Sequence, residues 1–357
     1  LLVIFIGLEI MSISSYILVG IKRKVARANE AALKYLLLGA FSTGFLLYGI
    51  SMLYGATGST ILPQIIDEVQ KNGADNPLVI VGMALVVIAM SFKIAIVPFH
   101  MWTPDVYTGA PTPVTGFLSA AAKAAGFAVF VRVLLTGIPL DGANWENVLW
   151  ILAVLSMTVG NLMALRQSEV KRMLAFSSIA HAGYVLVAVV VGSASAISGV
   201  IFYSFAYAVM GTGAFGILTI RDAGRVPQTY DDLAGYGRRN PFQALMMTLF
   251  MFSLIGLPLT GGFIGKLQIF SAALDGGWVW LTVIGILNSA LSAYYYLRVV
   301  MFMYMREGAL PEGTDLSGRS SGFALTGLIG TAVAVLYLGV FPDKIIELAS
   351  SSIQALL

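Results

Sequence analysis

Long apolar stretches make up most of the chain, and they decide what it can fold into. Of its 357 residues, 58% are hydrophobic and only 11% are charged, whereas about a quarter of the residues in soluble domains are charged. A stretch of about 20 apolar residues crosses a bilayer as an α-helix. We therefore expect an all-α polytopic membrane protein with about ten transmembrane helices. The expected spans lie near residues 1–21, 32–55, 78–101, 112–137, 147–165, 172–193, 195–220, 241–274, 277–304 and 320–341.

Two of these spans contain helix breakers. The span at 241–274 has 34 residues, which would make a helix of about 51 Å against a hydrocarbon core of about 30 Å. Pro258 and Gly256 lie in its middle, and proline removes a helix hydrogen bond and clashes with the preceding turn. The span at 78–101 carries Pro98 near its end. We therefore expect two broken helices.

Positive residues gather in alternate loops, which predicts the orientation. Lys and Arg stay mostly on the cytoplasmic side of a membrane protein. One set of loops holds fourteen of the 21 positive residues, whereas the opposite set holds only Lys71 and Lys344. With an even number of spans, both ends of the chain are then expected on the outer side. The fourteen are Lys22, Arg23, Lys24, Arg27, Arg166, Lys171, Arg172, Arg221, Arg225, Arg238, Arg239, Arg298, Arg306 and Arg319.

Several kinds of site are excluded or set aside. The chain has no cysteine, so it can form no disulfide, no thiolate-bound iron–sulfur cluster and no cysteine-based zinc site. The net charge of +3 is small and does not imply nucleic acid. Residues 211–216 read GTGAFG and match a dinucleotide-binding pattern, but they follow no strand. Helix packing through small residues explains them better.

Aromatic residues and the start of the chain have simple interpretations. Trp102 and Trp280 lie near span ends, as interface anchors do. The tyrosines at 294–296 are interpreted as packing and water contacts. Leu1 is not a methionine and already lies in an apolar run, so we expect the natural protein to begin earlier.

Three lysines lie inside apolar spans, at Lys93, Lys123 and Lys266. A charge at membrane depth costs about 2.5–3.5 kcal/mol on insertion scales and is rarely kept without a use. Lys123 is about ten residues into its span, roughly 15 Å from the end and near the midplane. Glu9 offers a counter-charge in the same bundle. We interpret these groups as proton-handling; buried ion pairs that only satisfy each other are the structural alternative.

Sequence motifs identify a family resemblance. The run FKIAIVPFHMWTPDVYTGAPTPVTGFLSAAAKAAGF resembles the signature of the antiporter-like, proton-pumping membrane subunits of respiratory complex I, the NADH:quinone oxidoreductase. Within that group the chain is most similar to the N type, also called subunit 2. The matches GLEIMSISSYILVG, EAALKYLLLGAFSTGFLLYGI, EVKRMLAFSSIAHAGY and GLPLTGGFIGKLQIF occur in the family's order. The resemblance therefore covers nearly the whole chain.

The resemblance implies an inverted-repeat antiporter-like fold. The first repeat would cover 1–137 and be truncated at its start, because the first four of the family's fourteen helices are missing from this sequence. The second repeat would cover 147–304, and a C-terminal helix and tail would cover 320–357. A multi-pass place in the bacterial inner (plasma) membrane follows from the same resemblance.

The family's proton-transfer residues map onto positions of this chain. Glu9 would pair with Lys93 on the first broken helix, Lys123 would be the connecting lysine, and Lys266 would belong to the second broken helix. His181 would relay between the two halves through water, because histidine titrates near neutral pH. For His181 a hydrogen-bonded structural role is the alternative.

Other residues are assigned accessory roles. His100 follows the helix break at Pro98, as Lys266 follows Pro258. His100 and Lys34 are possible accessory groups, although His100 also fits a loop contact. Lys34 and Arg132 are close enough to span ends for their aliphatic stems to carry the charge to the interface.

The resemblance places the redox chemistry outside this chain. Flavin and iron–sulfur clusters are expected in partner subunits, which would handle NADH and quinone, with no catalytic, cofactor-binding or metal-binding residue here. The alternative is a subunit of an Mrp-type multisubunit cation/proton antiporter, which shares the fold. Related membrane-bound hydrogenases and F420-linked dehydrogenases use such subunits too, and a scaffold whose charges only lock helices together is a third possibility. The segments VYTGAPTPV and SSIAHAGY favour complex I.

Overall fold

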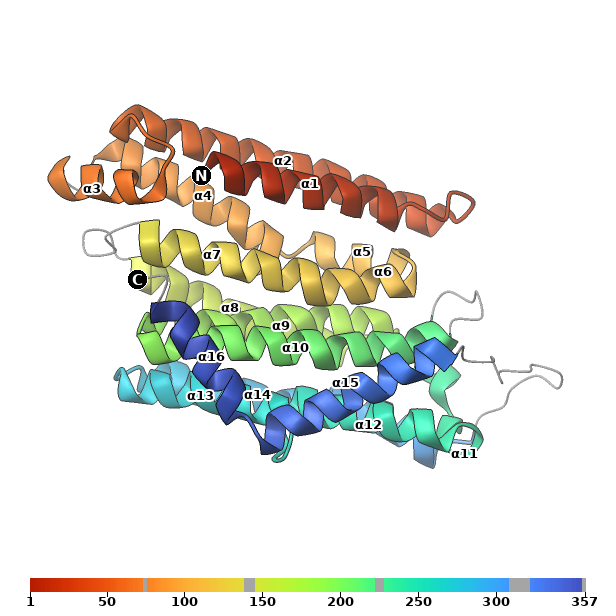
Figure 1. Ribbon diagram of the computed structural model, residues 1–357. Helices are drawn as coiled ribbons and strands as arrows, with labels where there is room; N and C mark the ends of the chain where they lie inside the picture. Colours follow the sequence, from red (N-terminus) through yellow and green to blue (C-terminus); the bar gives the residue numbers. More distant parts are fainter. Residues whose placement is uncertain (73–75, 138–144, 222–227, 308–321, 355–357) are drawn as a thin grey trace.

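A computed structural model describes residues 1–72, 76–137, 145–221, 228–307 and 322–354. These residues form a layered bundle of α-helices that run mostly side by side (Figure 1). The helices are α1 (Leu2–Val19), α2 (Ala26–Thr57), α3 (Leu62–Asn72), α4 (Pro77–Ile94), α5 (Trp102–Gly109), α6 (Thr112–Phe117), the π-helix η1 (Leu118–Ala122), α7 (Lys123–Gly137), α8 (Trp145–Leu165), α9 (Val170–Val191), α10 (Ala194–Arg221), the 3-10 helix η2 (Asp231–Leu233), α11 (Tyr236–Arg239), α12 (Pro241–Ile255), α13 (Gly261–Asp275), α14 (Val279–Met305), α15 (Gly322–Val340) and α16 (Asp343–Gln354).

The predicted polytopic all-α fold is confirmed. Within the described ranges, nine helices are long and apolar enough to cross a membrane, with η1 joining its flanking helices into one span. The remaining expected span, 241–274, which is the eighth along the chain, is the pair α12 and α13. The expected span 32–55 begins earlier than predicted, at Ala26, because ion pairs accommodate the charges in the first turns of α2.

Both expected helix breaks are present. The first comes before its proline: α4 ends at Ile94, and Ala95 takes a left-handed conformation with φ 60°. The backbone N–H of Val97 then donates to Ser156 Oγ on α8 at 3.0 Å. In the second break α12 ends at Ile255 and is capped by Gly256, whose φ of 88° costs glycine little because it has no Cβ.

Trp102 is not the interface anchor that its position suggested. It is buried and stacks on Tyr35 with ring centroids 4.6 Å apart. Its indole N–H donates to the carbonyl oxygen of Phe92 at 2.8 Å, which satisfies an end carbonyl of α4. Trp280, in contrast, is 76% exposed, as an anchor in the headgroup region should be.

α9 lies at the centre of the bundle and is almost wholly buried. It is covered by α5, α8, α10, α13 and α14. α10 beside it contains the GTGAFG segment, and a Cβ at Gly213 would lie 2.3 Å from the Phe250 ring on α12. Close helix packing therefore accounts for these glycines.

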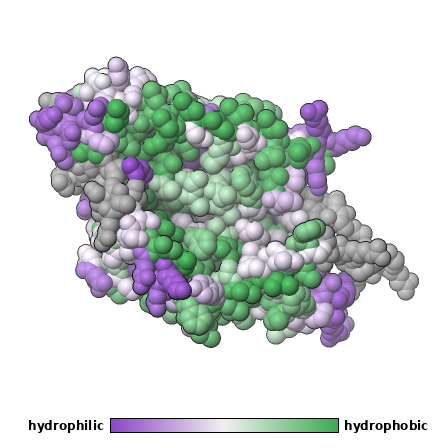
Figure 2. Space-filling model, in the orientation of Figure 1, coloured by the Kyte–Doolittle hydropathy of each residue, from purple (hydrophilic) through white to green (hydrophobic). Residues whose placement is uncertain are grey.

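The visible face of the bundle is apolar between two more hydrophilic ends (Figure 2). At one end, Arg27 at the start of α2 forms an ion pair with Glu169 at 2.8 Å, and Arg298 donates to the Gln167 carbonyl oxygen at 3.4 Å. Basic residues from three expected loops thus share one end, which is consistent with the alternation in the sequence. Arg225, Arg319 and residues 320–321 lie outside the described residues.

Two amphipathic helices were not predicted. α3 and α16 have 11 and 12 residues, too few for a span of about 20. A hydrophilic patch on the apolar face lies over α16 (Figure 2). In Figure 1 α15 ends beside the loop between α12 and α13, and α16 begins at the same place.

Candidate functional site

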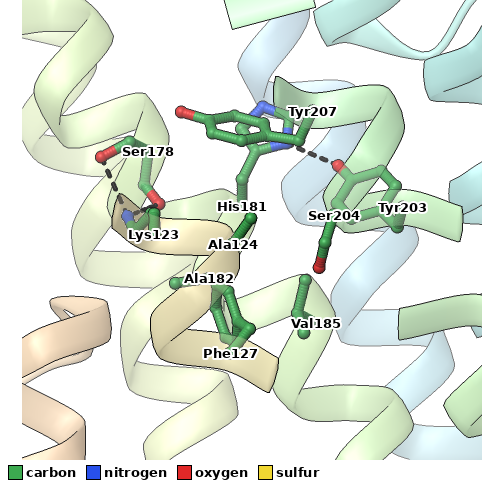
Figure 3. Close-up of a pocket in the computed structure, with 10 residues that line it drawn as sticks. All are labelled: Lys123, Ala124, Phe127, Ser178, His181, Ala182, Val185, Tyr203, Ser204 and Tyr207. Atoms are coloured by element: carbon green, nitrogen blue, oxygen red, sulfur yellow. Dashed lines mark hydrogen bonds between the residues drawn. The ribbon is translucent and has the colours of Figure 1, made fainter. Parts of the chain in front are cut away.

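Lys123 is buried between α7 and α9. It is the first residue of α7, directly after η1, and only 4% of it is exposed. Its ammonium group donates to Ser178 twice, to the backbone oxygen at 2.6 Å and to Oγ at 3.0 Å (Figure 3). π-helical turns inside α-helices are frequent at functional sites. The two bonds replace part of the lysine's lost hydration.

His181 lies on α9, one turn after Ser178, and each of its ring nitrogens has a hydrogen-bond partner. Its Nδ1 is 2.5 Å from the hydroxyl of Tyr203 on α10, and its Nε2 is 2.9 Å from the hydroxyl of Tyr296 on α14. The Tyr296 hydroxyl also bonds Ser177. A neutral imidazole donates from one nitrogen and accepts at the other. One tyrosine therefore donates to His181 while the other accepts from it, and moving a proton through the ring exchanges these roles.

Lys266 lies on α13 and reaches back across the second helix break. Its ammonium group donates to the carbonyl oxygens of Leu254 at 3.1 Å and Ile255 at 2.9 Å, the last residues of α12. It also donates to Ser289 Oγ on α14 at 2.8 Å and lies 4.8 Å from the centroid of the Tyr184 ring. Cations at helix C-termini and over aromatic rings are electrostatically favoured. The broken helix itself therefore supplies the environment of this charge.

Three residues of α9 connect these groups. Ser178 accepts hydrogen bonds from Lys123, and the Tyr184 ring contacts the Lys266 ammonium group. His181 lies between Ser178 and Tyr184 in the sequence. Tyr184 follows Ser178 by six positions, which correspond to about 9 Å along a helix. The rings of His181 and Tyr184 are 5.5 Å apart between centroids. The expected group of two lysines and a histidine is thus arranged along one central helix.

A small cavity of about 10 Å³ lies beside Lys123 and His181. Its polar lining comes from Ser178, Tyr203, Ser204 and Tyr207. In Figure 3 the Tyr203 hydroxyl points towards His181, and the Lys123 ammonium group points towards Ser178. A cavity of this volume matches the space for about one water molecule.

Lys93 and Glu9 do not form the direct ion pair that was expected. The Lys93 ammonium donates to Ser12 Oγ on α1, and Glu9 Oε1 accepts from Thr43 Oγ1 at 2.6 Å. Ser12 is three residues after Glu9, on the same side of α1, and its hydroxyl takes the position next to the lysine. Glu9 still acts electrostatically on Lys93. Glu9 and Lys93 therefore belong to one polar site, in which Ser12 and not Glu9 accepts the hydrogen bond from the lysine.

Lys34 and His100 lie apart from the line along α9. His100 lies in the first break, and its Nδ1 has no hydrogen-bond partner among the described residues. Lys34 forms ion pairs with Glu30 at 2.7 Å and Asp105 at 2.8 Å in a hollow at the basic end. Arg172 also binds Asp105, at 2.7 Å. Burial raises the pKa of the Asp105 carboxyl, but the hydrogen bonds from Lys34 and Arg172 outweigh it and hold this pKa below its usual range.

Lys171 was counted as a loop cation, but it is buried in the first turn of α9. Its ammonium group donates to the carbonyl oxygen of Ala110, the C-cap of α5, at 2.7 Å. It therefore stabilises the helix that follows the first break. Arg132 is mostly exposed on α7, as expected for a charge near a span end.

A buried amide network was also missed. Asn161 on α8 is fully buried. Its Oδ1 accepts from Tyr295 at 2.7 Å, and its Nδ2 donates to the Tyr184 hydroxyl at 3.3 Å and to Asn288 Oδ1 at 3.2 Å. Tyr184 is the ring that contacts Lys266, so this network fixes the ring at the second lysine. Nothing in a run of apolar residues marks which Asn or Tyr faces inward.

A family profile described as NADH:quinone oxidoreductase/Mrp antiporter, transmembrane, matches residues 1–292. These residues include both helix breaks and Lys93, Lys123 and Lys266. The chain belongs to this family. The antiporter-like polytopic fold predicted from the motifs is therefore confirmed.

Relatives within the family are similar over nearly the whole chain. NADH-quinone oxidoreductase subunit N of Trichlorobacter lovleyi is 51% identical over 356 residues, which cover 99% of this chain and 72% of that protein. NADH-quinone oxidoreductase subunit N 1 of Solibacter usitatus is 48% identical over 354 residues, 99% of this chain and 72% of that protein. The expected similarity to the N type is confirmed.

Solved structures of the family share the fold. A chain of respiratory complex I from Thermus thermophilus has a TM-score of 0.82 and 37% identity, covering 96% of this chain and 74% of that one. A chain of the Mrp complex from Dietzia sp. has a TM-score of 0.85 at 23% identity, covering 97% and 72%, which shows the fold alone. Within the described ranges, no group of three His, Asp or Glu side chains is placed to hold a metal ion.

Proposed function

We propose that this chain is a proton-translocating membrane subunit of an NADH:quinone oxidoreductase complex. The observation that carries the proposal is the arrangement along α9, where Lys123, His181 and Lys266 all have polar partners on or beside one buried helix. The family supports the same reading, since relatives that are 51% and 48% identical are named NADH-quinone oxidoreductase subunits N.

The proposed path begins at Glu9 and Lys93 on the cytoplasmic side. It continues to Lys123, passes His181 and reaches Lys266, from which protons leave outward. Moving one charge across 100 mV costs about 2.3 kcal/mol, and a charge pair at 4 Å is worth about 4 kcal/mol at an effective dielectric constant of 20. Changing one such contact is therefore of the right scale to drive a transfer step.

His181 has the relay role in this scheme. Its two tyrosine partners come from α10 and α14, so a proton accepted on one side leaves on the other after the hydrogen bonds reverse. Lys123 and Lys266 both act electrostatically on the imidazole. A change of charge on either lysine therefore changes the energy of the relay step.

Electron transfer belongs to partner subunits in this proposal. Flavin and iron–sulfur clusters there would oxidise NADH and reduce quinone, while this chain moves protons without redox chemistry of its own. The neighbouring membrane subunits would transmit the energy. The basic end of the bundle faces the cytoplasm and both chain ends face outward.

The second candidate is a subunit of a multisubunit cation/proton antiporter. The family profile includes the Mrp antiporters, and the fold matches a chain of the Mrp complex. Such a subunit would need no redox partner, and its transport would follow an imposed ion gradient.

The deciding experiment uses the complete complex in proteoliposomes. NADH and quinone are added, and internal pH is followed with a dye in sodium-free medium and with sodium present. We expect pH changes that require quinone reduction, disappear with a protonophore and persist without sodium. Proton movement that needs only an imposed sodium gradient would support the antiporter and overturn our proposal.

A further inference from the structure

The end of α15 packs directly on the second helix break. A Cβ atom added at Gly339 would lie only 2.2 Å from the carbonyl oxygen of Leu259 and 2.4 Å from the backbone nitrogen of Thr260. Real Cβ atoms do not come so close to backbone atoms, so only glycine allows this approach. The contact is reciprocal, because a Cβ at Gly261 would lie 2.8 Å from the Cβ of Leu338.

The backbone that Gly339 touches leads directly to the partners of Lys266. Leu259 and Thr260 follow the end of α12, which supplies the two carbonyl oxygens that accept from the lysine. Leu259 has φ 69°, a left-handed conformation that is unfavourable for a residue with a branched side chain and needs support from its surroundings. The backbone of α15 at Gly339 packs against it at this point.

Support at the two breaks comes from different sources. At the first break, the backbone N–H of Val97 bonds Ser156 of α8 and the indole of Trp102 bonds Phe92. At the second, a short loop joins the two halves α12 and α13, and the end of α15 lies beside this loop (Figure 1). α15 is otherwise mostly exposed, and its buried side chains Leu328, Val335 and Leu338 face α10, α12 and α13. Its packing against the bundle, on α10, α12 and α13, therefore includes the break itself.

We propose that Gly339 is a positioning residue for proton transfer at Lys266. By letting α15 reach the backbone of the break, it holds the carbonyl oxygens of Leu254 and Ile255 where the ammonium group needs them. This inference rests on the proposed function, because it assigns a role at a lysine of the proposed path. A small displacement of the break would lengthen the lysine's bonds without touching the lysine.

The test compares glycine variants of α15 in the assembled complex. Gly339→Ala and Gly339→Val introduce a Cβ against the break, whereas Gly330→Ala and Gly330→Val are matched controls, because a Cβ at Gly330 has nothing within 4 Å. The measurement is the initial rate of quinone-driven proton pumping per assembled complex, as a function of pH. A misplacement of about 1 Å in a reacting geometry costs tenfold or more, so we expect Gly339→Val to lose about tenfold.

We expect Gly339→Ala to assemble normally, to pump at an intermediate rate and to have a displaced pH profile, while both Gly330 variants match the unchanged complex. A merely structural contact would alter assembly without displacing the pH profile. Wild-type pumping and pH profile in both Gly339 variants would overturn the inference, and so would failure of both to assemble, since the contact would then be a folding requirement.

A Lys266→Ala complex separates this inference from the proposed function. If Lys266→Ala abolishes pumping while Gly339→Val pumps normally, only the role of Gly339 is wrong. If Lys266→Ala itself pumps at the wild-type rate, the proposed path is wrong and the inference falls with it.

Discussion

Lys266 donates a hydrogen bond of 2.9 Å to the carbonyl oxygen of Ile255, across the break between α13 and α12. The lysine and its acceptor lie on different halves of one interrupted helix, so movement of the halves and the environment of the charge are coupled. At the first break the lysine lies on the half that precedes the break and bonds Ser12 of α1 instead. Lys93 and Lys266, the lysines of the two broken helices, therefore have different surroundings.

A substitution at Ser289 tests how much a single hydrogen bond to Lys266 contributes to the pumping rate. Its hydroxyl is one of three hydrogen-bond acceptors of the ammonium group, at 2.8 Å. Ser289→Ala removes this acceptor, and a hydrogen bond to a charged group is worth about 1.5–3 kcal/mol. We expect a several-fold slower pumping rate in a normally assembled complex. Ser271→Ala is the control, because Ser271 is exposed on α13, the helix that carries Lys266, and bonds only its own turn at Leu267. Equal rates in the two variants would argue against a role for the Ser289 contact.

Tyr296 offers a direct test of the histidine relay. Tyr296→Phe keeps the ring but removes the hydroxyl that bonds His181 Nε2. A positioned proton-transfer group contributes about 100-fold or more, and we expect at least a tenfold loss of pumping rate, with a larger solvent deuterium isotope effect.

The matched control for this experiment is two residues away. Tyr294 is 63% exposed, so Tyr294→Phe should leave the rate unchanged. Pumping at the full rate by the Tyr296→Phe complex would show that Tyr296 is not on the proton path. His181 would then have no proton-transfer partner on α14.

Asp105 makes the stability of the folded protein depend on pH in the acid range. Its pKa is lower in the folded protein than in the unfolded chain, so its ion pairs contribute stability above the unfolded value of about 3.9, and this is lost as the pH falls through the folded pKa. About a third of the side chain is exposed, so the contribution is about 1 kcal/mol or less. We expect Asp105→Asn to lower the thermal midpoint between pH 6 and 8, and the difference to shrink as the pH falls below about 4 towards the folded pKa of Asp105.

Thermal unfolding of the purified complex, followed by intrinsic fluorescence across this pH range, measures the effect. Asp67→Asn on the exposed surface of α3 serves as the control and should follow the unchanged protein at each pH. A difference for Asp105→Asn that stays constant down to pH 3 would show that the carboxylate charge is not responsible.

Much of the fold could be predicted because hydrophobic length is a strong signal. The spans follow from windows of about 20 apolar residues, and the break at Gly256 and Pro258 follows from the excess length of one window. The short helices α3 and α16 could not be found in this way. Neither could the position of the first break, which begins three residues before Pro98, where Ala95 turns left-handed.

The charged members of the site were also readable, but their partners were not. A lysine in an apolar span stands out, as Lys123 does. Ser178, Tyr203 and Tyr296 do not, because α9 and its neighbours are apolar on all sides and no periodicity shows which polar residue faces which neighbour. The same difficulty hid the burial of Lys171, whose position beside a loop in sequence resembled that of an ordinary surface cation.

The central claim is that protons cross the middle of this subunit on Lys123. The most direct test replaces it by an uncharged side chain of similar length, Lys123→Met, and measures the rate of proton pumping driven by quinone reduction in proteoliposomes, per assembled complex. The account predicts that the complex assembles and that pumping falls by at least tenfold, as expected for loss of a positioned proton-transfer group, while Lys123→Arg, which keeps a charge, retains more of the rate. Pumping by Lys123→Met at the rate of the unchanged complex would contradict the account.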